Sequence, residues 1–468
     1  MTGRLNLLLL AVALASGLAG CSTYRPWINT GLPASADGTP AAVPAPQRRA
    51  ASPVVVAVTL SGGGARAAAF GLGVLREMKE TIFRVDGQPT TLLDQVGLVS
   101  GVSGGSILAA HYAAFGDETL TRFEPDFLLL PFEAGLIKQA FAPQRMYRLT
   151  SPWYGRSHIL AQRFDELYRG LTFGDLKARP GAPDLLVTAT DLTTGAPFDF
   201  TPEQFGLICA DLAHTPLSFA IAASSAVPIL LSPMTLKNRA GECSPAPQPA
   251  RSGDAAADYR ARMLALSADS YRNAKERPFI HLVDGGVSDN TGARLMLDRL
   301  VAGGSMASSF PDARPGSIRR LILVAVNSER DLAERVDASD AVPTTSQVIE
   351  TLVFGAGARD TQVTLAMLND DARRWQEELR RTRGKPGSPF AADAELHIVS
   401  VSLHDVPDDK IRHSLLRVPT AFTIEAFDVR ALQQAGAEAL RGTQAFTRAK
   451  ASLNRLDRLD RSQAAPSP

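Results

Sequence analysis

The 468-residue sequence has few of the residues that build metal centres or bind nucleic acids. It contains 3 cysteines and 7 histidines, and no group of cysteines and histidines has the spacing of metal ligands. Its 49 lysines and arginines nearly balance its 48 aspartates and glutamates, whereas a nucleic-acid-binding surface needs clustered positive charge. The sequence therefore predicts no metal, no other cofactor and no nucleic-acid partner.

A hydrophobic run long enough to cross a membrane comfortably is missing from the N-terminal region. A short basic start at residues 1–4 precedes an apolar stretch at residues 5–18, which is too short for such a span. The small residues of Leu18-Ala19-Gly20-Cys21 then have the character of a cleavage site. Residues 1–20 resemble a bacterial lipoprotein signal peptide, which implies that Cys21 is lipidated and becomes the new N-terminus.

A lipidated Cys21 would hold the protein at a membrane, since several acyl chains anchor a protein stably where one does not. Ser22 rather than aspartate follows the cysteine, which by the same resemblance favours the outer membrane. We therefore expect an outer-membrane lipoprotein of a bacterial cell envelope. An ordinary signal peptide with an incidental cysteine is the alternative.

Two cysteines remain once Cys21 is assigned to the anchor. In an oxidising periplasm Cys209 and Cys243 could form a disulfide, but an unpaired, buried Cys209 agrees equally well with the sequence. The pairing stays open at this point.

Composition divides the chain into segments. Residues 21–52 are rich in alanine and proline and predict a tether of roughly 30 Å or more. Residues 53–450 form the predicted body, with insertions near 123–154 and 238–277, and residues 451–468 form a polar tail. The first insertion is unusually apolar, which suggests either an acyl-chain channel or lid that touches a membrane, or plain core packing.

Strand-like runs alternate with helical runs along this body. This alternation predicts an α/β fold of three layers, with a mostly parallel central sheet and helices on both faces. The strand-like runs are residues 54–60, 96–100, 185–190, 279–283, 320–326 and 396–403. A charged run at residues 370–383 is most simply a solvated helix face, and the insertion at 238–277 is expected to be peripheral.

A glycine-rich turn connects one of these strands to a helical run. Gly101-Val102-Ser103-Gly104-Gly105 follows an apolar strand and precedes an apolar helix start. This pattern is typical of a nucleophile elbow, in which Gly101 and Gly105 allow the tight bend that exposes the hydroxyl of Ser103.

Two further turns have the residues that such a serine needs. The backbone amides of Gly62, Gly63 and Gly64 could hold the oxyanion of a tetrahedral intermediate, because no side chain blocks their approach. Asp284, after the strand at 279–283, is the best placed carboxylate to accept the serine proton. That transfer is favoured if burial brings its pKa nearer to the working pH.

These motifs resemble those of the bacterial patatin-like phospholipase family in order and spacing over roughly residues 53–300. The resemblance implies a Ser103–Asp284 dyad without histidine, an oxyanion loop supported by Arg66, and a phospholipid or lysophospholipid substrate. One departure is Ala67, where the family usually has glycine. The matching blocks are 62–66, 101–105, 223–228 and 284–286, with 419–422 also similar.

Other interpretations of the same residues remain. Gly62, Gly64 and Ala67, with Asp86 further on, also satisfy a dinucleotide-binding fingerprint, but this leaves Ser103 unexplained. Arg66 is alternatively a solvated cation at the start of a helix. A non-catalytic envelope lipoprotein with the same fold is a further alternative.

A Ser-Asp-His esterase of α/β-hydrolase type is the alternative enzyme. His404 is the best placed base for it, because it follows Asp284 in the chain and ends a strand-like run. His111 lies about two helical turns beyond Ser103 and is too far from its hydroxyl. His281 is expected on the opposite strand face from Asp284.

Overall fold

The computed structural model describes residues 21–33, 52–243, 259–329, 339–351 and 356–464. The proposed signal peptide at 1–20 lies outside the described residues, as do residues 34–51 of the expected tether. The body between 52 and 464 is built around one large sheet with a small separate hairpin.

The large sheet has eight strands in the order β10-β9-β1-β4-β5-β8-β7, with β6 paired to β5. The first five run parallel to one another, whereas β6 and β8 are antiparallel to β5, and β7 is antiparallel to β8. The strands are β1 (Val54–Leu60), β4 (Val96–Val102), β5 (Asp184–Asp191), β6 (Pro197–Asp199), β7 (Met234–Lys237), β8 (Phe279–Val283), β9 (Ile318–Asn327) and β10 (Phe390–Ser402). The hairpin pairs β2 (Ile82–Val85) with β3 (Gln88–Thr91).

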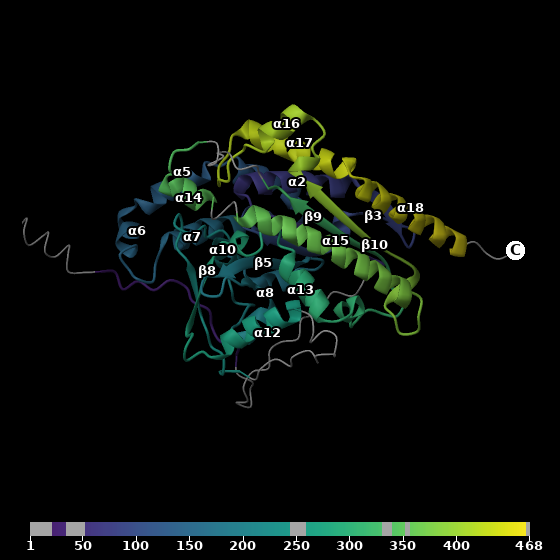
Figure 1. Cartoon of the computed structure of the whole chain (residues 1–468), viewed down its shortest axis with the longest axis horizontal. Coiled ribbons are helices and arrows are strands. Elements are labelled where there is room, and N and C mark those ends of the chain that lie inside the picture. The colour runs from purple at the N-terminus through teal and green to yellow at the C-terminus, as the bar shows by residue number, and fades with distance from the viewer. Residues whose placement is uncertain (1–20, 34–51, 244–258, 330–338, 352–355, 465–468) are drawn as a thin grey trace, which may run out of the picture.

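Helices cover both faces of this sheet. In Figure 1 the long helix α15 crosses the centre of the view, with α2 and α17 above it. The helices are α2 (Gly64–Glu80), α3 (Gly104–Phe115), α4 (Thr119–Phe123), α5 (Phe132–Ala140), α6 (Pro143–Arg148), α7 (Arg156–Tyr168), α8 (Phe173–Ala178), α9 (Pro202–Leu207), α10 (Leu217–Ser224), α12 (Tyr259–Arg272), α13 (Arg294–Ala302), α14 (Thr345–Glu350), α15 (Ala356–Thr382), α16 (Asp409–Leu415), α17 (Ala426–Gly442) and α18 (Gln444–Ala464).

Alternate residues of the central strands enter two different cores. On β9, Ile322 and Val324 pack into the larger core, which includes α2, α3 and α17. Their neighbours Leu321 and Leu323 pack into a second core with α13 and α15. Because side chains alternate between the faces of a strand, the sheet is covered on both sides. The three-layer α/β fold predicted from the sequence is confirmed.

The predicted strands are present, some of them longer than expected. The largest difference is β10, which begins at Phe390 instead of residue 396. The short strands β6 and β7 and the β2–β3 hairpin are absent from the sequence prediction. They have few residues each, so their period of two is hard to distinguish from irregular chain.

The N-terminal strap, which we define as residues 22–33, lies against the body. Asn29 is fully buried and its side-chain amide exchanges hydrogen bonds with the backbone of Lys237, and Gly31 forms a β-bridge with Ala210. This part of the chain therefore differs from the free tether expected over residues 21–52. The alanine-rich and proline-rich composition of this segment does not reveal the contacts that the buried Asn29 makes.

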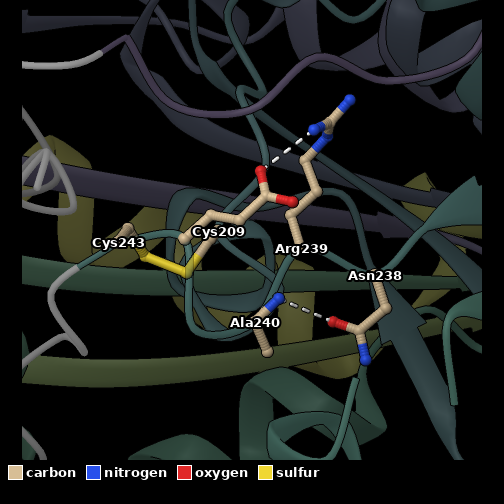
Figure 2. The surroundings of a disulfide bond; sticks show 6 residues. Cys209, Asn238, Arg239, Ala240 and Cys243 are labelled. Carbon is tan, nitrogen blue, oxygen red and sulfur yellow. Dashed lines mark hydrogen bonds and ion pairs between the residues drawn. A yellow bond between two sulfur atoms is a disulfide. The ribbon is translucent and has the colours of Figure 1, made fainter. Parts of the chain in front are cut away.

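A disulfide lies beneath the strap. Cys209 and Cys243 are bonded, so the pairing that the sequence left open is settled in favour of the bridge (Figure 2). The bridge connects the turn after α9 to the loop after β7, where Asn238 accepts a hydrogen bond from the Ala240 amide. Leu32 of the strap donates its amide to the Cys209 carbonyl. Strap, turn and loop thus form one joined unit.

Two segments expected at the surface contribute to the interior instead. In α12, part of the insertion expected to be peripheral, Arg260 is buried and pairs with Asp371 of α15 at 2.7 Å. In α15, Trp375 and Leu379 are buried in the second core, so the charged run at 370–383 is not simply a solvated face. Charge alone misled the prediction because one apolar stripe is enough to dock a helix.

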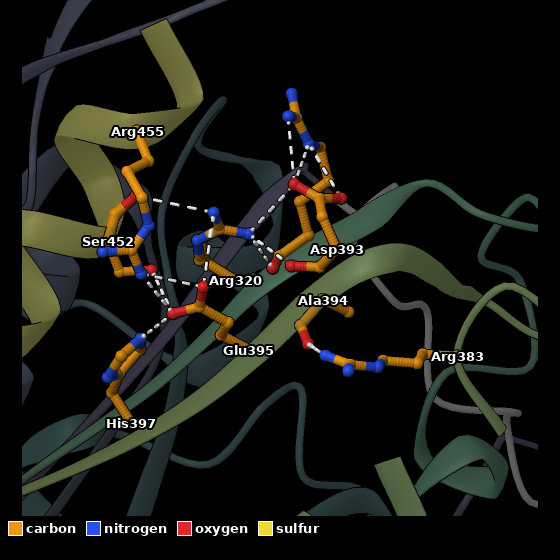
Figure 3. Close-up of polar contacts among 9 residues, drawn as sticks. Arg320, Arg383, Asp393, Ala394, Glu395, His397, Ser452 and Arg455 are labelled. Carbon is orange, nitrogen blue, oxygen red and sulfur yellow. Dashed lines mark hydrogen bonds and ion pairs between the residues drawn. The ribbon is translucent and has the colours of Figure 1, made fainter. Parts of the chain in front are cut away.

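Part of the C-terminal segment packs on the body, which a polar tail does not lead one to expect. The expected polar tail at 451–468 continues α18 as far as Ala464, and Leu453 and Leu456 are buried. The side chain of Ser452 reaches Glu395 on β10, at 2.7 Å. This contact belongs to a charged cluster in which buried Arg320 lies between Asp393, Glu395 and the middle of α18 (Figure 3).

The apolar insertion at 123–154 divides into a buried part and an exposed part. Phe123, Phe127 and Phe132 are buried in the larger core, where the Phe127 ring contacts the other two in tilted and edge-on arrangements. By contrast, Phe141 and Met146 remain 71% and 51% exposed. Among the helices described, none is both long and apolar enough to span a bilayer.

Candidate functional site

The sheet topology brings the predicted site residues together at the carboxyl ends of the central strands. Because β1 and β4 are parallel neighbours, the turns that follow them, at 61–64 and 103–105, emerge side by side. Strand β8 reaches the same end of the sheet from the opposite direction, since it is antiparallel to β5 and pairs Val283 with Thr190. Asp284 therefore lies near the turn that contains Ser103.

Ser103 occupies the tight bend between β4 and α3. Its φ of 49° and ψ of −121° lie in a sparsely populated region, which costs of order 1–3 kcal/mol and persists only where surrounding contacts enforce it. A Cβ on Gly101 would stand 2.6 Å from the Gly105 carbonyl, so neither the bend nor its close packing tolerates a side chain there. The predicted elbow has the expected strand-turn-helix context.

Neighbouring groups hold the elbow in place. The amide of Ser103 donates to the Ser224 hydroxyl at 2.8 Å, and Ser224 in turn donates to the Thr188 carbonyl at 2.6 Å. The amide of Asp284 donates to the Ala226 carbonyl at 2.9 Å. The block at 223–228, which the sequence singled out without a role, thus holds the backbone of both Ser103 and Asp284.

The side chains of Ser103 and Asp284 form a direct hydrogen bond. Ser103 Oγ donates to Asp284 Oδ2 at 2.9 Å, and the Gly286 amide donates to Oδ1 at 2.8 Å. Both residues are buried, at 8% and 6% exposure. Burial raises the pKa of Asp284 to about 6, against the opposing effect of these two hydrogen bonds. A carboxylate whose pKa lies near neutral pH therefore contacts a serine hydroxyl.

The glycine turn after β1 offers two amide donors rather than three. Gly62 was expected to be one of them, but its amide donates to the Asn290 carbonyl at 3.0 Å. No protein acceptor in the described part of the chain bonds the amides of Gly63 and Gly64. The turn leaves Gly64 at φ 61°, packed against the Ala421 backbone where a side chain would clash. The 419–422 block thus fixes this turn.

Arg66 is buried against the glycine turn, beside Gly63, and is not a solvated cation. It is 2% exposed. Its guanidinium donates to the Ser328 carbonyl at 3.0 Å and to the Val418 carbonyl at 2.8 Å. One guanidinium therefore connects the start of α2 to the chain after β9 and to the segment before the 419–422 block.

The loop after Asp284 contains two residues that the sequence interpretation missed. Asp289 is completely buried and accepts hydrogen bonds from the amides of Thr291, Gly292 and Arg294. The side chain of Asn290 lies against the backbone of Gly62 and Gly286, between the two halves of the site. The only sequence signal was an Asp-Asn pair in a turn, which usually indicates local capping.

The histidines lie away from the hydroxyl of Ser103. His404 is exposed in a 3₁₀ turn after β10, three strand positions from β4 in the sheet order, which amounts to ~14 Å. His111 is buried against Phe115 and Phe123, and burial lowers its pKa to about 4. His281 is exposed on β8 and contacts the hydroxyl of Thr235.

The dinucleotide interpretation does not fit this topology. The fingerprint requires its acidic residue at the end of a second parallel strand, whereas Asp86 lies in the exposed turn of the separate β2–β3 hairpin. Within the described residues, no cluster of three or more histidine, cysteine or acidic side chains is arranged to hold a metal ion.

Comparison with known proteins shows which family the chain belongs to. A model of the patatin-like phospholipase family matches residues 58–297, just over half of the chain. The chain belongs to the patatin-like phospholipase family, whose members are serine-dependent lipid ester hydrolases. A search of curated proteins gave no match.

Similar solved structures include human GIVD cytosolic phospholipase A2, at 13% sequence identity and a TM-score of 0.45, with 86% of this chain and 63% of that chain covered. The same human enzyme in complex with methyl gamma-linolenyl fluorophosphonate has 11% identity and a TM-score of 0.40, with 88% and 60% covered. VipD from Legionella pneumophila has 11% identity and a TM-score of 0.24, with 93% and 77% covered. The chain thus spans less than two thirds of the human enzyme.

Proposed function

We propose that this protein is a phospholipase A-like or lysophospholipase-like enzyme that cleaves carboxylic esters of phospholipids through a Ser103–Asp284 dyad. The observation that carries the proposal is the 2.9 Å hydrogen bond from Ser103 Oγ to Asp284 Oδ2, at the point where the glycine turn begins α2 and the elbow begins α3. No histidine is required, because the carboxylate contacts the hydroxyl directly.

In the acylation step, Ser103 Oγ attacks the ester carbonyl carbon while its proton passes to Asp284 Oδ2. A carboxylate with a pKa near 6 is a stronger base than an ordinary aspartate, so the transfer costs less. The C–O bond to the glycerol oxygen then breaks, and the protonated Asp284 returns its proton to that leaving oxygen. A lysophospholipid or a glycerol-phosphodiester departs, and the acyl group remains on Ser103.

The negative charge of the tetrahedral intermediate needs fixed donors. The amides of Gly63 and Gly64 supply them in this proposal, supported by the positive ends of α2 and α3. Arg66 is a positioning residue, since its guanidinium bonds to backbone carbonyls on two other segments rather than pointing at the substrate. Asp284 next deprotonates a water, which attacks the acyl carbonyl, releases the fatty acid and restores the Ser103 hydroxyl.

Covalent labelling tests this assignment. A fluorophosphonate probe should label the wild-type protein and not Ser103→Ala, and the labelled peptide should contain Ser103. His404→Ala should retain full labelling and phospholipid hydrolysis, whereas a triad enzyme that depends on His404 would lose both. Wild-type protein that neither labels nor hydrolyses any lipid ester would instead favour a non-catalytic envelope lipoprotein.

We further propose that Cys21 is the lipidated N-terminus of a bacterial envelope lipoprotein, most simply of the outer membrane. The sequence Leu18-Ala19-Gly20-Cys21 and the exposed, unpaired state of the Cys21 thiol support this. Mass spectrometry of the N-terminal peptide should find acyl chains and no residues before Cys21. Recovery of residues 1–20 on the mature protein would contradict the proposal.

A further inference from the structure

Large apolar side chains are exposed on one part of the surface around α5 and α6. We define the docking face as six of these residues, which are 41% to 71% exposed: Ile137, Phe141, Met146, Tyr147, Trp153 and Leu230. Burying such side chains inside the body would be the usual outcome, since each large apolar side chain gains roughly 1.5–3 kcal/mol on leaving water. A cluster of exposed ones therefore indicates a surface that something else covers.

The segments that carry these residues are neighbours, since α5 contacts both α6 and α7. Trp153 stacks under the guanidinium of Arg25 on the strap, at 3.3 Å from its ring centroid. Arg156, at the start of α7, donates to the carbonyl of Ile229, the neighbour of Leu230. Ile229 has a φ of 72°, which is rare for a β-branched residue. The chain is thus held in a strained turn that leaves Ile229 and Leu230 exposed, at 61% and 65%.

The same surface is positively charged. Residues 134–156 include Lys138, Arg145, Arg148 and Arg156 but no aspartate or glutamate. The strap adds Arg25 and likewise has no acidic residue. A face that combines exposed apolar side chains with basic ones matches an anionic lipid surface, which gains from both. A protein partner would need acidic groups arranged against these particular arginines, and nothing in the structure selects such an arrangement.

The docking face adjoins the Ser103–Asp284 site. At the start of α5, Glu133 accepts the Phe422 amide at 2.7 Å, and the neighbouring Ala421 accepts the Ala65 amide beside the glycine turn. On the other side, the turn with Ile229 and Leu230 follows Ala226, whose carbonyl holds the Asp284 amide. A bilayer seated on this face would therefore lie next to the site.

The N-terminal strap begins at this surface too. The amide of Ser22 donates to the Thr150 hydroxyl at 2.8 Å, between α6 and Trp153, and Arg148 of α6 lies over the Tyr24 ring. Figure 1 shows the purple strap beginning on the same side of the molecule as α5 and α6. An acyl group on Cys21 would therefore enter the membrane where the docking face meets it.

We propose that the docking face seats on an anionic phospholipid bilayer and holds the Ser103–Asp284 site against the lipid surface. The six apolar side chains of the docking face enter the interface, while Lys138 and the arginines contact lipid phosphates. The docking is a binding event, so it stands independently of whether Ser103 is catalytic.

Single substitutions with a matched control test the apolar part. Met146→Asp on the docking face should lower binding of the purified full-length protein to phosphatidylglycerol vesicles about tenfold or more. Met263→Asp is the control, because Met263 on α12 has nearly the same exposure, 53% against 51%, and α12 lies at the lower edge of Figure 1, away from α6. Phe141→Asp should behave as Met146→Asp does. Equal binding by the Met146 and Met263 variants would overturn the proposal.

The charge part needs its own comparison. Binding to phosphatidylglycerol vesicles should exceed binding to phosphatidylcholine vesicles, and Lys138→Glu should lower the first severalfold with little change in the second. Lys138 is suitable because its side chain is exposed and is outside the arginine contacts described above. Equal binding to the two lipids in wild type would overturn the assignment of an anionic partner.

Activity measurements separate this proposal from the proposed function. Met146→Asp should hydrolyse a short-chain soluble ester as wild type does but hydrolyse vesicle phospholipid more slowly. Loss on both substrates would indicate damage to the site and would count against a docking role. If wild type hydrolyses neither, the proposed function fails, while the vesicle-binding comparison still decides the docking face.

Discussion

At the edge of the sheet, the Glu395 carboxylate lies between Arg455 and Ser452 at 2.8 and 2.7 Å, with Arg320 at 3.9 Å. At its centre, the Asp284 carboxylate touches only the Ser103 hydroxyl and the Gly286 amide among the contacts described above. Burial raises the pKa of both carboxyls, but the hydrogen bonds and cations at Glu395 outweigh it and lower that pKa to about 2. The pKa of Asp284 rises to about 6.

The difference shows how neighbouring groups set the pKa of a buried carboxyl. A carboxylate with nearby guanidinium groups is fixed as an anion and connects structural elements. A carboxylate buried among neutral donors costs free energy to ionise and stays close to exchanging its proton near neutral pH. The first arrangement suits a joint between β9, β10 and α18, and the second suits proton transfer.

The largest expected effect comes from Asp284→Asn. The amide keeps the shape of the carboxylate but cannot accept the serine proton, so kcat/KM for a phospholipid ester should fall ~10⁴-fold. Because the folded-state pKa of Asp284 lies above its ordinary value, ionised Asp284 destabilises the fold at neutral pH. The variant should therefore unfold at an equal or higher temperature than wild type. Loss of activity together with a lower Tm would indicate a structural role instead.

The charged edge should show the opposite pattern. Arg320→Met removes a guanidinium that is 1% exposed and contacts both Asp393 and Glu395, so the free energy of unfolding should fall by about 1.5–3 kcal/mol, as for a lost hydrogen bond to a charged group. Arg455→Met is the matched control: its side chain is 48% exposed, and its ion pair is worth about 0–1 kcal/mol. Denaturant-induced unfolding of both variants measures the loss in free energy of unfolding. Equal losses in the two variants would show that burial of the guanidinium does not set the size of the effect.

The pH dependence of activity distinguishes the two carboxylates. Asp284 must be ionised to accept a proton, so kcat/KM should fall about tenfold per pH unit below pH 6, where the group is protonated. Glu395→Gln should leave this acidic limb of the pH–activity profile unchanged. Stability should respond at lower pH, because the contribution of Glu395 is present above its ordinary pKa of 4.5 and is lost as the pH falls towards 2.

The smallest expected effect is a shift in the midpoint of the acidic limb of the pH–activity profile. The Asn290 side chain lies beside Gly286, whose amide bonds Asp284. A negative charge there disfavours ionisation of Asp284, so Asn290→Asp should move the acidic limb upward by roughly half to one pH unit. Asn290→Ala, which adds no charge, should leave the midpoint where it is. An unmoved limb in the aspartate variant would show that residue 290 is electrostatically remote from Asp284.

Much of the site was predictable because backbone geometry determines it locally. A turn that bends as sharply as the one at Ser103 requires glycine at 101 and 105, so the sequence itself reveals the turn. The contribution of Gly62 was not predictable, since its amide is bonded by Asn290 from a distant loop. Asn290 and Asp289 were missed for the same reason: their partners are known only once that loop is placed.

By itself, the sequence determined the three-layer α/β class, the strand-turn-helix elbow and the candidate pair Ser103 and Asp284, because periodicity and glycine turns are local properties of a chain. Only the tertiary structure decided that β8 runs antiparallel to β5, that the strap and α18 pack on the body, and that Arg320 is enclosed by carboxylates. Strand direction, burial and charge pairing depend on groups brought together from far apart in the chain, and one residue's neighbours in sequence do not specify them.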